Sequence, residues 1–270
     1  PMTDSSLVRV LARQTRHKVG LVPLRQVQSG SDTLRTALDK LALDSVRHVV
    51  VDAVADTDLG IIGEAVGDDV LVTGGSGVAL GLPAAYRRRG LITHRSGADT
   101  LPKIDGPSAV LSGSCSAATL GQIAAFKGAH LVLDTDAICR GEDIAGKAMA
   151  WVKDKLRNGP ILLSASDKPD AVKALQTKYG VEKSSHAIEK TMAALARGLV
   201  GAGVNRLVVA GGETSGAVVG ALDVTALRIG REIDPGVPWT ASVGGKPMLL
   251  ALKSGNFGAP DFFTKAFEQL

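Results

Sequence analysis

Four short segments rich in glycine and hydroxyl side chains are the residues of this sequence best suited to chemistry. They are TGGSG (73–77), SGSCS (112–116), GGETSG (211–216) and SGNFG (254–258). Each follows an apolar run that we interpret as a β-strand, and an open parallel sheet binds ligands beyond the carboxyl ends of its strands. Glycine lets the backbone approach an oxyanion, and the hydroxyls of Thr214 and Ser215 can donate to it. Glycines also simply tighten turns, so the three loops of the later chain together, rather than any one alone, favour a phosphate or carboxylate site.

The familiar nucleotide-binding motifs are missing from these loops. None of them contains GxxxxGK[ST], and none contains GxGxxG followed by an acidic residue. The set of motifs typical of protein kinases is also absent. A nucleotide site in this chain would therefore be of another kind.

Other chemically capable residues have simpler interpretations. The run Arg87–Arg89 could clamp phosphate, but a solvated charge patch near a helix end is favoured. Asp134 and Asp136 flank a strand end where Mg²⁺ ligands occur, although helix caps use aspartate there equally well. Cys115 could act as a nucleophile, but no partner histidine is evident. We therefore assign no metal ligand.

Composition indicates a globular protein and excludes several classes. The 270 residues are 45% hydrophobic, 21% charged and 3% aromatic, with a net charge of +4. The charges are scattered and aromatic rings for base stacking are few, so we expect no nucleic-acid partner. The two cysteines form no zinc or disulfide pattern, which suits a reducing compartment. No apolar run is long enough to span a membrane and no signal-peptide layout is present, so we expect a cytoplasmic protein without a membrane partner.

Apolar runs that alternate with amphipathic segments predict an α/β fold with mainly parallel sheets. The strands we expect lie at 20–24, 48–53, 130–135 and 161–166, with closing strands at 225–229, 238–242 and 247–258. Three more strands are expected to run into glycine loops within 69–77, 108–116 and 206–216. The helices we expect begin after Asp4 or Ser5 and lie at 32–43, 58–66, 119–128, 142–157, after Asp167, 185–200, 216–222 and from Asp261. Gly244 and Gly245 should turn the chain between the last two strands.

A polar stretch without periodicity, residues 93–106, separates two such α/β units and predicts an interdomain linker. We therefore expect two α/β domains, residues 1–92 and 107–270, with a ligand cleft between them.

Several segments resemble the four-carbon acid sugar kinase family. The match is carried by GGETSG (211–216), LSGSCS (111–116), DVTALRIGREIDPGVPWT (223–240), LALKSGNFGAPDFF (250–263), PMTDSSLVR (1–9) and LVTGGSGVALGL (71–82). The resemblance implies an ATP-dependent kinase that phosphorylates the 4-hydroxyl of 3-oxo-tetronate, D-threonate or D-erythronate, with Mg²⁺ as the counter-charge. The sequence does not choose among these acids.

The resemblance also implies roles for the domains and loops. Residues 1–92 would be the remainder of a substrate-binding domain, and residues 107–270 a nucleotide-binding domain. The ATP contacts it implies are Ser112 or Ser114, Gly211, Gly212, Glu213, Thr214 and Gly255. The substrate contacts it implies are Gly74, Gly75 and Ser76.

The family's N-terminal Asp-Asp-Leu-Thr-Gly-type motif, which holds the sugar acid, is absent from this sequence, so no catalytic residue is assigned. We expect the chain to correspond to the later two-thirds or so of a family member, and to be incomplete for catalysis by itself. The alternative is a non-catalytic module that binds a nucleotide or small anion without the substrate half. The expected partners are a sugar-acid substrate and, as for many α/β enzymes of this size, a second copy of the chain.

Overall fold

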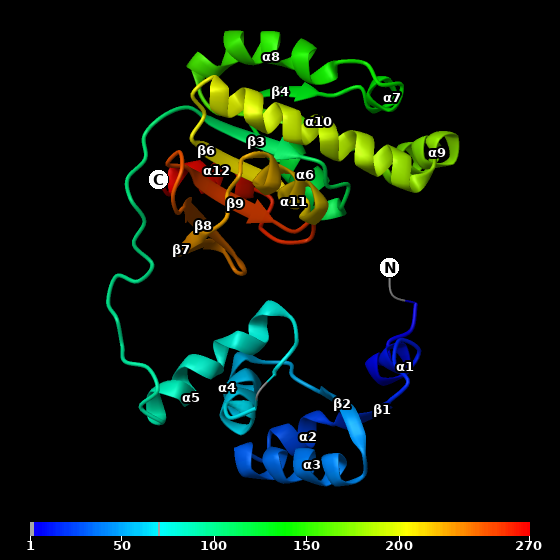
Figure 1. Ribbon diagram of the computed structural model, residues 1–270, viewed down its shortest axis with the longest axis vertical. Coiled ribbons are helices and arrows are strands. Elements are labelled where there is room, and N and C mark those ends of the chain that lie inside the picture. The colour runs from blue at the N-terminus through cyan, green and yellow to red at the C-terminus, as the bar shows by residue number, and fades with distance from the viewer. Residues whose placement is uncertain (1–2, 70) are drawn as a thin grey trace. The chain divides into compact units, whose positions relative to one another are not determined.

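A computed structural model describes residues 3–69 and 71–270 of the chain (Figure 1). The backbone divides into two compact units, Pro1–Ser96 (unit 1) and Gly97–Leu270 (unit 2). Helices and strands alternate in both units, so the predicted α/β class is confirmed. In the part of the chain that the structure describes, no helix combines the length and apolarity needed to cross a bilayer.

Unit 1 contains two parallel strands among its described residues, β1 (Lys18–Val22) and β2 (Val46–Val51). Its helices are α1 (Leu7–Ala12), α2 (Leu24–Val27), α3 (Ser31–Leu43), α4 (Asp56–Val66), the 3₁₀ helix η1 (Ser76–Leu80) and α5 (Leu82–Arg88). Val22 of β1, Leu34 of α3 and Ile62 of α4 form a small core with Val27 and Val66. The amphipathic spacing of α3 places Leu34 on this core, because positions three and four apart share one helix face.

The strand predicted at 69–77 is wrong for the described residues. Residues 71–74 are irregular, and Val70 lies outside the described residues. Leu71 is 84% exposed. An apolar run becomes a strand only where a neighbouring strand can take its backbone hydrogen bonds, and the described residues of this run gain no such neighbour.

The first helix is capped by a different residue from the two predicted. The N-cap of α1 is Ser6, whose Oγ accepts from the N–H of Arg9, rather than Asp4 or Ser5. Asp4 instead accepts from the N–H of Ser6 and pairs with the Arg9 guanidinium. The Asp4 carboxylate, which lies outside the helix, therefore stabilises the start of α1.

Unit 2 is built on a mixed sheet, whose strands are β3 (Ser108–Ser112), β4 (Ala129–Val132), β5 (Ile161–Ser164), β6 (Arg206–Ala210), β7 (Leu227–Asp234), β8 (Val237–Ser242) and β9 (Leu249–Lys253). The order across the sheet is β4-β5-β3-β6-β9-β8-β7. The five strands from β4 to β9 are parallel, while β8 and β7 are antiparallel additions. The predicted turn at Gly244 and Gly245 is confirmed, with φ of 79° and 63°. The strand predicted at 225–229 is longer, because β7 continues to the turn at Gly236.

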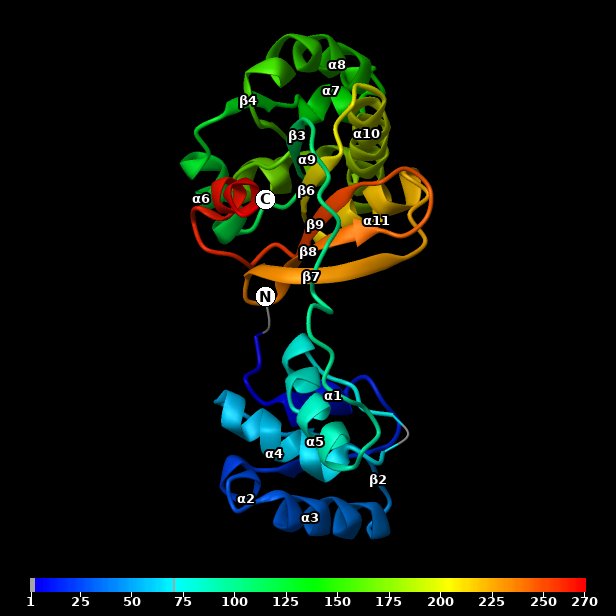
Figure 2. The same cartoon turned by 90° about the vertical axis from the view of Figure 1, so that its left-hand side faces the viewer.

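Helices cover both faces of this sheet. They are α6 (Ala117–Ala125), α7 (Thr135–Cys139), α8 (Ile144–Lys155), the 3₁₀ helix η2 (Leu156–Asn158), α9 (Pro169–Tyr179), α10 (Val181–Gly201), α11 (Gly212–Ala221) and α12 (Phe262–Glu268). Alternate strand residues serve opposite cores: Leu111 packs with the α8 and α10 residues, while Val110 packs with Phe262 and Phe263 of α12. Figure 2 shows α6 and α12 on one side of the sheet and α10 and α11 on the other. Both faces of the central strands are buried, which explains their uninterrupted apolar sequences.

Several predicted helix boundaries change, among them the starts of α9 and α11. Helix α9 begins at Pro169 with Lys168 at its N-cap and no side-chain cap, so Asp167 is not the cap; its carboxylate accepts from the adjacent N–H of Lys168 at 2.7 Å. The predicted end of the helix at Asn158-Gly159 is confirmed, with Gly159 at a φ of 126° after the 3₁₀ turn. Helix α11 begins at Gly212 rather than 216, so most of GGETSG is helical.

Candidate functional site

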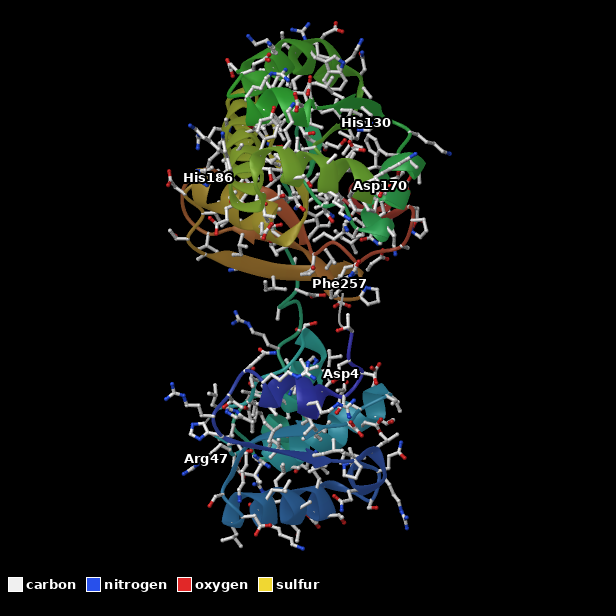
Figure 3. The ribbon with its side chains drawn as sticks, turned by 90° about the vertical axis from the view of Figure 1, so that its right-hand side faces the viewer. Asp4, Arg47, His130, Asp170, His186 and Phe257 are labelled. Atoms are coloured by element: carbon white, nitrogen blue, oxygen red, sulfur yellow. The ribbon has the colours of Figure 1, made fainter. Side chains whose placement is uncertain are left out.

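The carboxyl ends of β3, β5, β6 and β9 border a cavity of about 370 Å³ within unit 2. The residues that follow these strands and line it are Gly113, Ser114, Cys115, Ala165, Asp167, Gly211, Gly212, Glu213, Thr214 and Gly255. Asp170, in the first turn of α9, and Phe257, in the loop after β9, help to locate this edge in Figure 3. The three glycine loops of the later chain therefore meet in one place.

The opposite wall of the cavity comes from α9 and α10. Val172 and Leu175 of α9 and Ile188 of α10 supply apolar surface, and Gln176 and Ser185 supply polar groups. The cavity is thus apolar at one side and lined by backbone and hydroxyl groups at the other. This division suits a ligand with one flat apolar end and one anionic end.

The loop after β3 is tied to the neighbouring strand. The N–H groups of Gly113 and Ser114 both donate to the carbonyl of Ala210, at 3.0 and 3.1 Å. A Cβ at Gly113 would lie 2.3 Å from Oγ1 of Thr214, so the loops after β3 and β6 touch only because Gly113 lacks a side chain. The loop is held by backbone bonds before any ligand arrives.

Helix α11 points its first turn toward the cavity. Gly211, at a φ of 124°, makes the turn out of β6 and donates its N–H to the carbonyl of Lys253 at 2.8 Å. The N–H groups of the first helical turn have no partner within the helix, and the helix dipole places partial positive charge there. Gly212 lines the cavity, and a Cβ added to it would meet no protein atom within 4 Å. This arrangement can receive an anion at close range.

The loop after β9 is fixed by hydroxyls and a buried lysine. The carbonyl of Gly255 accepts from Oγ of Ser116 at 2.6 Å, Oγ1 of Thr119 at 2.9 Å and Nζ of Lys253 at 2.9 Å. Farther along, Nε2 of Gln122 lies within 3.0 Å of the carbonyl oxygens of three successive residues, Phe257, Gly258 and Ala259. Helix α6 therefore holds this loop at both ends.

Lys253 is fully buried at the end of β9. Its Nζ also donates to Oγ1 of Thr119 at 2.9 Å and to the carbonyl of Ser254 at 3.2 Å. No carboxylate pairs with it among the described residues. Burial without a counter-charge lowers the pKa of the Lys253 ammonium from 10.5 to about 8.

The charges around the cavity are unevenly placed. Three carboxylates, Asp167, Glu189 and Glu213, line it, and the described lining residues include no lysine or arginine. The ammonium of Lys253 lies directly behind Gly255, one hydrogen bond away from the lining. An anion in the cavity would be met by N–H groups and hydroxyls of the lining, with the ammonium of Lys253 behind them.

The structure brings together most of the residues implicated by the sequence. Ser114, Gly211, Gly212, Glu213, Thr214 and Gly255 all line the cavity. Ser112 does not: it is fully buried, and its Oγ lies 2.9 Å from Oγ of Ser166. Of the two serines left open by the sequence, the structure therefore places Ser114 at the site.

The fourth glycine loop, in unit 1, is different. Gly74, Gly75 and Ser76 are exposed, and Gly75 is the N-cap of η1. This loop follows irregular backbone, so the prediction that each glycine loop follows a strand is wrong here.

Most of the arginines and aspartates that the sequence offered as phosphate or metal ligands have structural partners. Arg88 pairs with Glu64, and Arg89 pairs with Asp68 at 2.7 Å, both at exposed positions. Asp134 caps α7 by accepting from the N–H of Ala137 at 2.9 Å. Hydrogen bonds from Lys178 and Tyr179 hold the pKa of Asp136 below its usual value. No cluster of three possible metal ligands occurs in residues 3–69 and 71–270.

Sequence reasoning missed the apolar wall and the lysine. The wall residues belong to helices that carry no motif, and their role depends on how α9 and α10 pack. Lys253 carried a weak signal, because a lysine that ends the apolar run LLALK is unusual for a strand buried on both faces. Thr119 and Ser116 carried only the signature of a helix start.

Two family models match successive parts of the chain. A model described as a nucleotide-binding C-terminal domain matches residues 109–263, and one described as a sugar-binding N-terminal domain matches residues 1–82. Together with the α/β fold, these matches define a sugar-binding and nucleotide-binding class of protein. The chain belongs to the four-carbon acid sugar kinase family.

Individual relatives match over the whole chain. A 3-oxo-tetronate kinase of Cupriavidus necator is 50% identical over 273 residues, and one of Burkholderia multivorans is 48% identical over 272; each match covers 100% of this chain and 63% of the relative. Crystal structures of a Haemophilus influenzae protein (39% identical, TM-score 0.68) and a Salmonella typhimurium protein (36% identical, TM-score 0.78) cover 99% and 100% of this chain. This chain matches 64% of the length of each. It therefore spans less than two-thirds of the proteins it resembles.

Proposed function

We propose that this chain supplies the nucleotide-binding part of an ATP-dependent kinase that phosphorylates a four-carbon sugar acid, with 3-oxo-tetronate as the first candidate. Support for the acid comes from relatives 46% to 50% identical to this chain, which are named 3-oxo-tetronate kinases. D-threonate and D-erythronate are the competing acids. The reaction would move the γ-phosphoryl group of ATP to the 4-hydroxyl of the acid.

The observation that carries the proposal is the convergence of three glycine loops and an apolar wall on one cavity. In this proposal the phosphates lie against the first turn of α11, at Gly212, Glu213 and Thr214, and against Ser114 and Gly255. The absence of a side chain at Gly212 leaves room for a phosphate to approach the backbone. The purine lies between α9 and α10, where flat apolar surface is buried most favourably.

Mg²⁺ has a supporting role in the proposal. Because the described residues gather no three-ligand cluster, we expect the ion to arrive on the triphosphate rather than in a protein cage. Asp167, Glu189 and Glu213 line the same cavity and can hold the waters of such an ion. When bound, Mg²⁺ supplies the charge neutralisation that phosphoryl transfer requires.

Unit 1 would take the sugar acid, with Gly74, Gly75 and Ser76 as proposed contacts. In the transfer, the O4 oxygen of the acid bonds to the γ-phosphorus while the bond to the β,γ-bridging oxygen breaks, so that ADP leaves. The O4 proton passes to a base that we do not assign. The proposed boundaries are residues 1–92 for this domain, 93–106 for the linker and 107–270 for the nucleotide domain.

The test has two stages on the whole chain. Thermal unfolding is measured with and without Mg·ATP, using GTP and NAD as controls, and then ADP release is followed with each of the three acids. ATP at a hundred times its dissociation constant should add about 2.7 kcal/mol of apparent stability. A cooperative melt that ATP does not shift contradicts the proposal. An ATP-selective shift without ADP release supports the alternative, a binding module without turnover.

A further inference from the structure

Lys253 is a buried lysine that the proposed nucleotide site does not yet use. It is fully buried, yet its Nζ bonds only to neutral groups: Oγ1 of Thr119 and the carbonyls of Ser254 and Gly255. Removing an ammonium from water is costly unless an opposite charge compensates it. The residues described in the structure supply no such charge within bonding distance of Lys253.

The position of Lys253 connects it to the cavity by two routes. Through Gly255, its Nζ reaches the lining in one hydrogen bond of 2.9 Å. Through Thr119, it reaches Ser114 by successive contacts of 2.9 and 3.2 Å between Nζ, Oγ1 and Oγ. Both Gly255 and Ser114 line the cavity. A negative charge placed there would therefore act on Lys253 at short range through well-packed protein.

We propose that Lys253 is a positioning residue, whose ammonium orders the Ser114 hydroxyl and the Gly255 loop for the phosphates of the nucleotide and takes those phosphates as its counter-charge. This inference rests on the proposed nucleotide site. It adds a residue behind the lining and a measurable consequence, namely that binding of the anion and protonation of Lys253 favour one another.

The linkage has a definite direction. In the free chain burial lowers the pKa of Lys253 to about 8, so that above this pH the side chain becomes neutral. A bound polyphosphate favours the ammonium and raises that pKa. Binding near pH 8 must then take up a proton, and affinity must fall as the pH rises above 8.

Proton uptake by Lys253 has to be distinguished from uptake by other ionisable groups nearby. Those on the elements packed around it and the cavity are Cys115, Asp167, Glu189, Glu213, Asp234 and Lys265. Asp234 and Lys265 pair with each other. Cys115 is the thiol among the lining residues, so the Cys115→Ser variant is the control that separates it from Lys253.

The experiment is calorimetric titration of the whole chain with Mg·ATP between pH 7.5 and 9, in two buffers of different ionisation enthalpy. The phosphates of ATP are ionised throughout this range, since a phosphate monoester has its second pKa at about 6. At pH 8 we expect uptake of about half a proton per ATP, because about half of the Lys253 side chains are neutral before binding. The same uptake must persist in Cys115→Ser.

Two variants separate charge from structure. Lys253→Met keeps the length of the side chain without its charge, and should bind Mg·ATP about tenfold more weakly at pH 7.5 with no proton uptake. Lys253→Arg keeps a charge that does not titrate, and should restore affinity at pH 9 without proton uptake. A folded Lys253→Met with unchanged affinity overturns the inference. If the variants do not fold, absence of proton uptake by the unmodified chain overturns it.

Tripolyphosphate serves as a second probe that lacks the nucleoside. If it binds with proton uptake while Mg·ATP does not bind, the role of Lys253 stands and the nucleotide assignment fails. If Mg·ATP binds without uptake, the nucleotide assignment stands and the role of Lys253 fails. If neither probe binds, both are overturned.

Discussion

Two glycine loops of almost the same composition, TGGSG in unit 1 and GGETSG in unit 2, take different structures. Gly211 follows β6, donates to the carbonyl of Lys253 and opens α11. Gly75 follows irregular backbone, is exposed and opens a short 3₁₀ helix. What turns a glycine-rich segment into a candidate site is the strand before it and the neighbouring loops to which it is tied.

Gly212 in unit 2 and the pair Gly63 and Gly81 in unit 1 also differ in what a side chain would meet. At Gly212 a Cβ would enter open space at the edge of the cavity. At Gly81 a Cβ would lie 1.9 Å from the carbonyl oxygen of Leu59, and at Gly63 it would lie 2.3 Å from the backbone of Gly81. Gly212 leaves room for a ligand, while Gly63 and Gly81 let helix α4 and the segment before α5 come into contact.

The largest expected effect is the loss of nucleotide binding in Gly212→Val. The Cβ of the valine would meet no protein atom within 4 Å, but the side chain would occupy the approach of a phosphate, so we expect at least a hundredfold weaker Mg·ATP binding, or about 2.7 kcal/mol. Calorimetry measures the affinity, and the melting temperature without ligand should stay within a few degrees.

The matched control is Gly216→Val, one turn later in α11. This glycine is also exposed with no atom within 4 Å of an added Cβ, but it does not line the cavity. It should bind Mg·ATP like the parent. Equal loss in both variants would trace the effect to helix α11 itself and remove Gly212 from the proposed site.

Gly81→Ala should give the converse result. Because backbone atoms would have to move away from the new Cβ, we expect unit 1 to lose about 2 kcal/mol of stability, while Mg·ATP affinity of unit 2 stays unchanged. Amide hydrogen exchange in α4 reads the local stability. Exchange in α4 as slow as in the parent would show that the close contact between Gly81 and Leu59 does not limit packing.

The lowered pKa of Lys253 predicts that the stability of unit 2 depends on pH. Its pKa is about 8 in the folded chain and 10.5 as a model group, so between these values the unfolded chain binds the extra proton. Stability therefore rises with pH in this window, by about 2 kcal/mol between pH 8 and pH 10, and is constant below it. The measurement is the unfolding free energy of the parent minus that of Lys253→Met.

Saturating Mg·ATP should flatten this rise, because a raised folded pKa moves the group toward its unfolded value. A difference between parent and Lys253→Met that does not change with pH would mean that the ammonium is not held in a strongly desolvated position. The change that Mg·ATP causes in the pH dependence of the unfolding free energy distinguishes Lys253 from any other group that titrates in the alkaline range.

The contrast between the units also shows why sequence predicted one of them better. In unit 2, runs such as SAVLS and RLVVA are mostly apolar because both faces of the sheet are covered, and the starts of their strands were predicted to the residue. The run at 69–73 has a similar composition, but its described residues, which leave out Val70, gain no partner strand. Pairing is a tertiary property that composition alone does not contain.

The residues of the candidate site likewise divide into those that the sequence could predict and those that it could not. The lining glycines stand in short motifs, so Gly211, Gly212 and Gly255 could be found without coordinates. Lys253 and Thr119 meet across 134 residues of sequence, and only the packing of α6 against β9 brings them together. Even between two serines in one loop, Ser112 and Ser114, the choice required knowing which one the sheet buries.

The smallest expected effect concerns Gly75→Ala, which tests whether the exposed loop of unit 1 has any function. An added Cβ would meet no atom within 4 Å and the backbone φ is −63°, so the change in stability should stay within about 0.5 kcal/mol. If the loop contacts the acid, Gly75→Ala should bind the acid more weakly than the parent chain does. Its affinity for Mg·ATP should equal that of the parent. Titration with 3-oxo-tetronate at saturating ATP reads this directly. An unchanged acid affinity would leave TGGSG as a helix start whose glycines serve only the turn, and would limit functional glycine loops in this chain to those that follow strands.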